Sequence, residues 1–170
     1  MKRPDAAEHA PYYGKYIELV PETDAVKAME TQLEKTLLLL CSLPASAGTR
    51  RYAPGKWSLC EVVGHMIDTE RVFAQRALFF ARKAPGALPG MDQDDWNKAA
   101  AYASFDLAEL ITEFEHVRRS DILFFRHLGE EAWGLRGTAS GCEFTVRALA
   151  FIIVGHERHH VEILRTRYAA

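Results

Sequence analysis

TVRALAFIIVGHERHHVEIL, the stretch from Thr145 to Leu164, decides the fold class of this chain of 170 residues. Its apolar side chains recur at the three- and four-residue spacing of an amphipathic helix. Thr145 is a residue type that caps helix N-termini, so we expect a helix from after Thr145 to about Tyr168. A helix with so broad an apolar face is stable only when other helices cover it.

Two segments upstream have the same helical period. The first runs from about Thr23, a candidate cap, and stops before Pro44. The second begins at Ser58, and the spacing from Ser58 to Glu61 is that of a capping box, in which each side chain accepts a hydrogen bond from the other residue's backbone N–H. This second helix is expected to run to about Arg82.

A third helix is expected from Asp106 to near Leu128, with Gly129 as a left-handed C-terminal cap. The connection before it, residues 83–105, is long, so it either forms a functional lid or crosses the bundle with Trp96 filling a gap. No segment shows the alternation of a strand. The sequence therefore predicts an all-α fold, a four-helix bundle with a long connection between helices 2 and 3.

Length and composition fit one domain over residues 1–170, with an irregular N-terminal stretch at residues 1–20. The 21 basic and 23 acidic residues are spread along the chain, which argues against a nucleic-acid partner or an anionic membrane surface. The longest apolar run, residues 148–154, is far too short to span a bilayer. Three cysteines in no CxxC pair suit reduced thiols and a cytoplasmic location: Cys41, Cys60 and Cys142.

His156 and His160 project from the apolar face of the C-terminal helix, one turn apart. Two histidines at positions i and i+4 can place both imidazoles on one metal ion. A single histidine on an apolar face is more often an ordinary core residue. Two stacked histidines would each need a hydrogen-bond partner there, whereas one cation satisfies both, so we interpret the pair as metal ligands.

The third ligand must come from elsewhere in the chain. His65 borders the apolar face of the second helix and is the best upstream candidate. His9 lies in the irregular N-terminal stretch, and His116 and His127 lie among arginines and are interpreted as solvated. Three histidine ligands would leave one or two coordination positions for water or substrate, as in catalytic metal sites.

Glu70 and Glu157 lie near the middle of the apolar faces of the second and fourth helices. Each either orients a ligand histidine or acts as a general base on metal-bound water, or is a buried carboxylate paired with an arginine such as Arg147 or Arg76. Both are catalytic candidates without an assigned role.

The segment from His156 to His160 also matches the HExxH pattern of zinc metallopeptidases, in which Glu157 would be the general base. Ten residues follow His160, and no strand pattern accompanies the helix. A peptidase is therefore the weaker interpretation.

Together these motifs resemble the DinB-like (damage-inducible, YfiT-type) family of metal-binding four-helix bundles. The combination of the capped helix carrying His65 with the terminal Gly-His-x-x-His-His is its most specific part. The matching stretches are GKWS at 55–58, EVVGHMIDTER at 61–71, LPG at 88–90, DQDDW at 92–96, and residues 150–160.

The resemblance implies that His65, His156 and His160 bind a divalent metal ion, typically zinc or nickel in this family. It also implies a small-molecule substrate, because characterised relatives include thiol transferases that use bacillithiol or mycothiol, and many members are classed as metal-dependent hydrolases. For thiol transfer, the candidates to hold the carboxylates of a low-molecular-weight thiol are Arg71, Arg76 and Arg158.

Three function classes stay open. A metal-dependent enzyme acting on a small molecule, as hydrolase or thiol-dependent S-transferase, is favoured. A non-catalytic stress-response module that binds metal or dimerises is the alternative, and an HExxH metallopeptidase comes third. Apolar stripes exposed on long helices would favour a homodimer.

Overall fold

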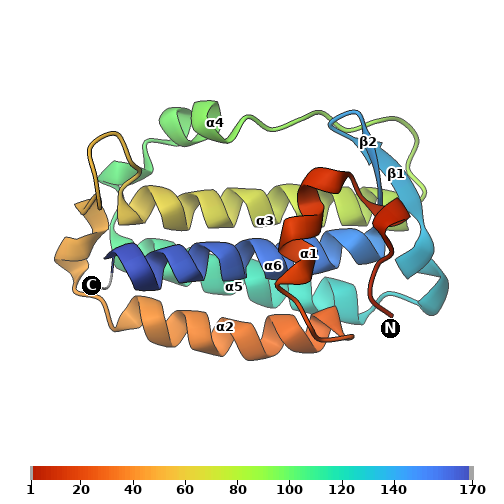
Figure 1. The fold of residues 1–170 in the computed structure, drawn as a ribbon, viewed down its shortest axis with the longest axis horizontal. Coiled ribbons are helices and arrows are strands. Elements are labelled where there is room, and N and C mark those ends of the chain that lie inside the picture. The colour runs from red at the N-terminus through yellow and green to blue at the C-terminus, as the bar shows by residue number, and fades with distance from the viewer. Residues whose placement is uncertain (1, 169–170) are drawn as a thin grey trace.

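Four long helices pack side by side in the computed structural model, which describes residues 2–168 (Figure 1). In chain order they are α2 (Ala25–Cys41), α3 (Leu59–Ala81), α5 (Leu107–Arg126) and α6 (Val146–Ile163). The predicted all-α four-helix bundle is confirmed. Across the described part of the chain, no helix is both long and apolar enough to cross a membrane.

The capping box at the start of α3 is present as predicted. Ser58 Oγ accepts a hydrogen bond from Glu61 N at 3.3 Å, and Glu61 Oε2 accepts one from Ser58 N at 2.6 Å. The start of α2 differs by one residue, because Asp24 rather than Thr23 is the cap. The carboxylate of Asp24 accepts from the backbone N–H of Lys27 at 3.1 Å.

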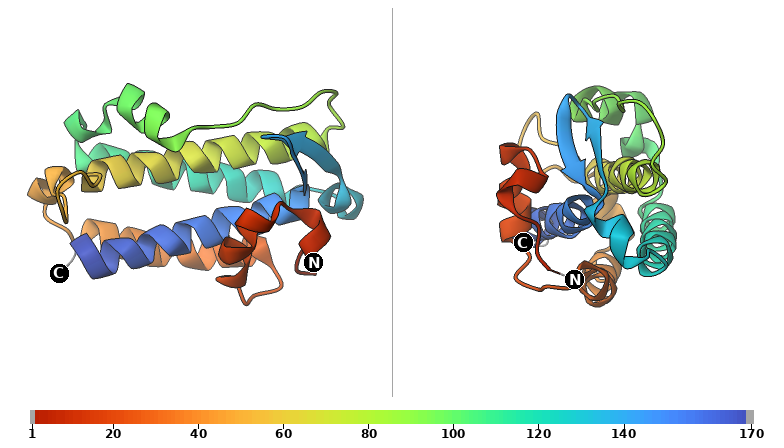
Figure 2. Two further views of the ribbon diagram at one scale, coloured as in Figure 1. Left: turned by 45° about the horizontal axis from the view of Figure 1, so that its top comes forward. Right: turned by 90° about the vertical axis from the view of Figure 1, so that its right-hand side faces the viewer.

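The long connection between α3 and α5 determines the topology. After α3 the chain returns along the outside of the bundle, forms the short helix α4 (Gln93–Ala100), and enters α5 at the end where α3 began (Figures 1 and 2). As a result α3 and α5 run parallel, and α2 and α6 run in the opposite direction. Short loops alone would have produced an up-and-down bundle.

α4 is held on α3 by Asn97, not by Trp96. The buried Asn97 side chain donates from Nδ2 to the carbonyl oxygen of Glu61 at 2.8 Å. Trp96 is 45 % exposed, so it does not fill a gap in the bundle. Of the two expectations for this connection, the gap-filling role of Trp96 is therefore excluded. The connection covers the start of α3.

The expectation that the chain contains no strand is wrong. β1 (Arg136–Ala139) and β2 (Cys142–Thr145) form an antiparallel hairpin before α6. The turn residues Ser140 and Gly141 have φ of 54° and 72°, as two-residue hairpin loops require. Strands of four residues are too short for an alternating pattern to stand out. Leu88 of the long connection also bonds to this hairpin.

The end of α5 also differs from expectation. The helix ends at Arg126 with His127 as its cap, and Gly129 has φ of −67° in an extended conformation. Gly129 instead starts a short 3₁₀ turn, because its carbonyl oxygen accepts from Ala132 N at 3.0 Å. The predicted left-handed cap at Gly129 is therefore wrong. The predicted end of the last helix is confirmed, since α6 continues as a wider helical turn to Tyr168.

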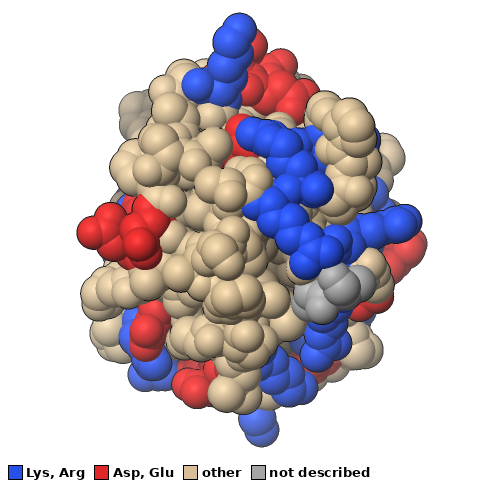
Figure 3. Space-filling model, turned by 90° about the vertical axis from the view of Figure 1, so that its left-hand side faces the viewer, with Lys and Arg blue, Asp and Glu red and all other residues tan. Residues whose placement is uncertain are grey.

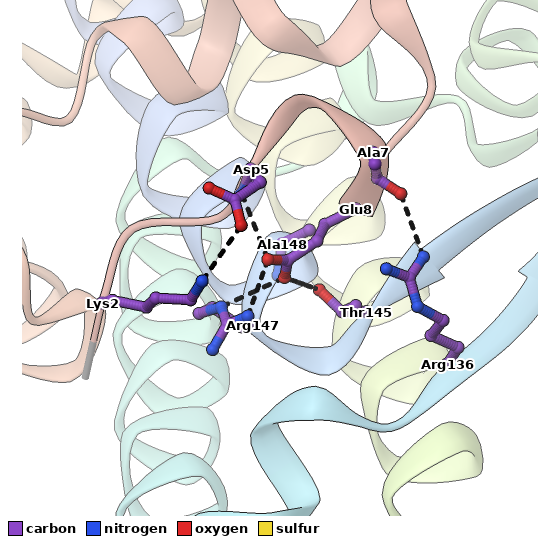
Figure 4. A network of polar contacts seen from close by, with 8 residues as sticks. All are labelled: Lys2, Asp5, Ala7, Glu8, Arg136, Thr145, Arg147 and Ala148. Atoms are coloured by element: carbon purple, nitrogen blue, oxygen red, sulfur yellow. Dashed lines mark hydrogen bonds and ion pairs between the residues drawn. The ribbon is translucent and has the colours of Figure 1, made fainter.

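The N-terminal stretch is more regular than the irregular segment expected, because it contains short 3₁₀ turns and the helix α1 (Gly14–Glu18). Glu8 is buried, with 3 % of its surface exposed, and its side chain joins this stretch to the start of α6 by hydrogen bonds (Figure 4). Its carboxylate accepts from Thr145 Oγ1 at 2.8 Å and from Arg147 Nη2 at 2.6 Å. Thr145 Oγ1 accepts from Ala148 N, so Thr145 is the α6 cap as predicted.

α1 packs directly on α6 at Gly155. A Cβ atom at Gly155 would lie 2.0 Å from the carbonyl oxygen of Tyr16, so only glycine permits this approach. The contact brings the Tyr16 ring to 5.4 Å from the ring of His156. The N-terminal stretch thereby becomes one wall of the candidate site.

Candidate metal centre

α3 and α6 bring the three predicted histidines together. His156 Nε2 lies 3.1 Å from His65 Nε2 and 3.1 Å from His160 Nε2. His156 and His160 project from successive turns of α6, and His65 faces them from the second turn of α3. Ligand nitrogens of all three lie within 4.8 Å of one another.

Burial keeps these imidazoles uncharged at neutral pH. It lowers the pKa of His65 to about 4. It also holds the pKa values of His156 and His160 well below the usual range, and the neighbouring histidines add to the effect. A neutral imidazole offers a nitrogen lone pair, which is the form that binds metal ions.

The three nitrogens fit a divalent cation better than they fit one another. A neutral imidazole nitrogen either donates or accepts, so His156 Nε2 cannot donate to one neighbour and accept from the other. Nitrogens bound tetrahedrally to zinc at about 2.0–2.1 Å lie roughly 3.3 Å apart. Moreover, His160 Nδ1 is buried without a hydrogen-bond partner among residues 2–168, so protein hydrogen bonds do not explain that ring's placement.

Two neighbours outside the histidine cluster, Thr69 and Trp57, orient the His65 ring. Its Nδ1 lies 3.3 Å from Thr69 Oγ1, one turn further along α3. The Trp57 ring packs against the imidazole at a centroid distance of 4.9 Å. A hydrogen bond at Nδ1 sets the tautomer that leaves the Nε2 lone pair free, as is usual for metal-binding histidines.

Two pockets reach the histidine cluster. The Tyr16 pocket, about 410 Å³, contacts His65 and His156, and its other lining side chains include Tyr12, Tyr13, Tyr16, Asp92 and Asp94. The Tyr52 pocket, about 250 Å³, contacts His160, and its lining includes Tyr52, Lys56, Trp57, Asp94 and Tyr168. A further hollow of about 460 Å³ between α2 and α6 contacts none of the three histidines.

The start of α4 forms a shared wall of the two pockets, because Gln93 and Asp94 line both. Asp92 caps α4, accepting from Asp94 N and Asp95 N at 3.0 Å each. The long connection therefore covers the histidine cluster. The arrangement leaves an approach to the histidines on each side of α4.

Glu70 and Glu157 lie in a buried ion pair with Arg118 of α5, which is fully buried. Arg118 donates to the two carboxylate oxygens of Glu70 at 2.5 and 2.8 Å, and from Nη1 to Glu157 Oε2. Thr36 of α2 donates to the other oxygen of Glu157 at 2.5 Å. This network joins all four bundle helices.

Arg118 remains charged in this setting. Burial opposes its charge, but Glu157 and Glu70 outweigh that effect and raise its pKa. Neither glutamate lines the Tyr16 or the Tyr52 pocket. The partners expected from the sequence are wrong, because Arg147 pairs with Glu8 and Arg76 donates to Pro89 O and Ser140 Oγ.

Arg118, one of the arginines near His116, was not among the candidate residues identified from the sequence. A usable signal was present, because Arg118 lies four residues after Phe114 and four before Ile122, in the buried stripe of α5. A charged residue in such a stripe has to be paired. His116 and His127 themselves are exposed, as interpreted.

Asp121 lies next to this network. Burial and the nearby charge of Glu70 raise the pKa of Asp121 to about 7. Its Oδ2 atom is buried and makes no hydrogen bond within the described part of the chain. Asp121 is therefore largely protonated in the folded protein below neutral pH.

The arginines expected to hold a thiol's carboxylates lie elsewhere. Arg71 pairs with Glu113 at 2.7 Å, and Arg158 pairs with Glu22 at 2.7 Å. Neither these two nor Arg76 lines the Tyr16 or the Tyr52 pocket. Anion recognition beside the three histidines would need other cations.

The sequence matches the family model of the DinB superfamily over residues 28–164. No curated protein shows significant similarity to it. The fold is similar to that of YfiT from Bacillus subtilis, described as a probable metal-dependent hydrolase with an unusual four-helix bundle topology. That match has a TM-score of 0.66 at 15% identity and covers 96% of this chain and 91% of YfiT.

The fold is also similar to that of a mycothiol-dependent maleylpyruvate isomerase, with a TM-score of 0.69 at 13% identity. The match covers 91% of this chain and 63% of the isomerase, so this chain spans less than two thirds of that protein. A variant of the isomerase matches with a TM-score of 0.69 at 11% identity. At such identities the likeness concerns the fold.

Proposed function

Because the chain belongs to the DinB superfamily, we propose that it is a metal-dependent enzyme that acts on a small molecule. His65, His156 and His160 would hold the ion. The observation that carries the proposal is the convergence of their three Nε2 atoms, with His156 Nε2 3.1 Å from each of the others. Zinc or nickel is the proposed metal, because both accept imidazole ligands.

A cation held by three histidines supplies an open coordination position that lowers the pKa of a bound water or thiol. The protein's own part is to position the ion and to admit reactants. Thr69 and Trp57 orient His65, and the network of Arg118 fixes the rotation of α6, on which His156 and His160 stand. We infer that Glu70 and Glu157 position these helices and take no proton from the substrate.

The reaction class is either hydrolysis or transfer of a low-molecular-weight thiol. The two fold neighbours support one class each, since one is described as a probable metal-dependent hydrolase and the other as a mycothiol-dependent isomerase. The two pockets beside the histidines give room for a second reactant, which thiol transfer needs. Screening the zinc-loaded protein against small esters and amides, and against thiols with electrophilic acceptors, separates the classes.

The peptidase alternative is disfavoured by the placement of Glu157. In the HExxH mechanism this glutamate acts on metal-bound water. Here its two oxygens accept from Thr36 and Arg118 in the centre of the bundle. We expect no cleavage of casein by the zinc-loaded protein, and cleavage that Glu157→Gln abolishes would revive this alternative.

Metal analysis of untagged protein tests the site. We expect about one zinc or nickel per chain, and loss of most of it in the double variant His65→Ala and His160→Ala. The double variant His116→Ala and His127→Ala is the control, because both side chains are exposed and distant in sequence from the cluster. Less than half a metal per chain, unchanged by the first double variant, would reject the site and favour the non-catalytic alternative.

Compartment and assembly stay predictions. We propose a cytoplasmic location, because the three cysteines Cys41, Cys60 and Cys142 are odd in number and form no CxxC pair. A homodimer is proposed from the exposed leucines Leu38 and Leu123 on neighbouring α2 and α5. Light scattering should give twice the chain mass of 19.2 kDa if it forms.

A further inference from the structure

The Tyr52 pocket opens at a basic end of the bundle. Figure 3 shows a band of Lys and Arg crossing this end. Two arginines lie beside the aromatic pair Tyr52 and Tyr168 at this end. Arg50 donates to Tyr168 O at 3.0 Å. The Arg167 guanidinium lies 6.0 Å from the centre of the Tyr52 ring. Lys56 lines the pocket itself.

Two of these cations are available to a ligand. Arg51 is occupied, because it pairs with Glu61 at 2.7 Å and donates to Lys56 O. Lys56 and Arg167 are exposed, and among residues 2–168 neither forms an ion pair with a carboxylate. Both charges can therefore pair with an anionic ligand.

The walls of the Tyr52 pocket are aromatic. Tyr52 and Tyr168 meet edge to face at a centroid distance of 5.4 Å. Tyr168 is fixed by its hydroxyl, which donates to Trp57 O at 2.5 Å, whereas Tyr52 is 40 % exposed. Flat aromatic walls bind the apolar body of a ligand, and cations at the opening pair with its anionic group.

The lining of the Tyr16 pocket is more acidic than that of the Tyr52 pocket. Asp92 and Asp94 line the Tyr16 pocket. Lys15, nearby, has its ammonium over the Tyr12 ring at 3.9 Å. Asp94 also lines the Tyr52 pocket, so an anion there would lie toward Lys56 and away from α4.

We propose that the Tyr52 pocket is the substrate subsite for an organic carboxylate with an aromatic body. The body lies between Tyr52 and Trp57, the carboxylate pairs with Lys56 and Arg167, and the far end of the ligand reaches the position beside His160. This inference rests on the proposed function, because it assigns the substrate class of the same metal centre.

Two matched probes of opposite charge test the subsite. Titration calorimetry compares 3-phenylpropionate with 2-phenylethylamine on zinc-loaded and zinc-free wild-type protein. We expect the carboxylate to bind about tenfold more tightly than the amine or better. The preference should survive zinc removal, because Lys56 and Arg167 rather than the metal hold the carboxylate.

Charge variants locate the binding. The double variant Lys56→Glu and Arg167→Glu should lose the preference. The control double variant Lys83→Glu and Arg136→Glu makes the same change of net charge at the opposite end of the bundle, near the β1–β2 hairpin. This control should keep the preference for the carboxylate. Asp94→Asn should tighten carboxylate binding, since it removes the opposing charge. Circular dichroism confirms that each variant is folded.

Three results would overturn the inference: equal affinity for the two probes, equal loss in both double variants, or loss of carboxylate binding when zinc is removed. The last would mean that the carboxylate is only a metal ligand. Absence of metal from the untagged protein, with carboxylate preference intact, would instead reject the proposed metal enzyme and keep the anion subsite.

Discussion

Arg118 is the residue on which the core depends most. Its guanidinium compensates Glu70 and Glu157 in a region from which water is excluded. Arg118→Met would leave two buried carboxylates unpaired, so we expect it to lower the free energy of unfolding by about 3–5 kcal/mol. Urea denaturation measures the change.

The adjacent Arg119→Met is a matched control, because Arg119 is half exposed and pairs with Glu115 on the surface. Exposed pairs contribute about 0–1 kcal/mol. Similar losses in the two variants would show that the Arg118 network does not stabilise the bundle.

Asp121 should make stability depend on pH. Its folded pKa of about 7 lies above the unfolded value of 3.8, so between these values the folded state binds more protons than the unfolded state. The contribution of Asp121 is therefore most favourable below pH 4 and is lost as pH rises to 7. In Asp121→Asn the side chain at this position does not titrate, so it makes no pH-dependent contribution to stability.

We therefore expect the melting temperature of Asp121→Asn, relative to wild type, to rise as pH increases from 4 to 7. Scanning calorimetry at several pH values measures this difference. A constant difference across the range would contradict the raised pKa. Asp95→Asn, on the exposed first turn of α4, is the control.

At the scale of elements, the α1 and α6 contact depends on Gly155. Gly155→Ala would place a methyl group 2.0 Å from the backbone oxygen of Tyr16, which cannot move without displacing α1. We expect a loss of about 1–3 kcal/mol in unfolding free energy. Gly129→Ala is the control, because a Cβ there meets nothing within 4 Å.

Gly155→Ala also distinguishes the packing of α1 on α6 from metal binding by the histidines. Because the histidines stand on α3 and α6, Gly155→Ala should keep its metal while losing the Tyr16 wall of one pocket. Metal analysis together with denaturation distinguishes these effects. A variant as stable as wild type would mean that α1 packs less closely on α6.

For the whole molecule, the metal should act as a cross-link between α3 and α6. A ligand that binds only the folded state at a hundred times its dissociation constant stabilises it by about 2.7 kcal/mol. For a chain of this length that corresponds to a rise in Tm of roughly 5–10 °C. Thermal unfolding with zinc and with a chelator measures it.

The double variant His65→Ala and His160→Ala should show no zinc-dependent rise in Tm, whereas His116→Ala and His127→Ala should show the full rise. Equal responses would place the stabilising zinc elsewhere.

Local sequence patterns were sufficient to predict the helix bundle and two of the three candidate metal ligands. The apolar period, the Ser58 and Thr145 caps and the one-turn spacing of His156 and His160 depend on neighbours within a few residues, which a sequence displays directly. His65 was the best of several candidates by helix position, and the family resemblance also indicated it. The hairpin was missed because its strands are short, and α4 because eight residues have little periodicity.

Contacts between distant segments required the tertiary structure. The pairing of Arg118 with Glu70 and Glu157 joins three helices, and which arginine reaches a buried glutamate depends on how those helices are rotated and packed. The placing of α4 between two pockets depends likewise on the path of the long connection. The sequence by itself determined which side chains could bind a metal, and the packing of α3 against α6 decided that their nitrogens meet.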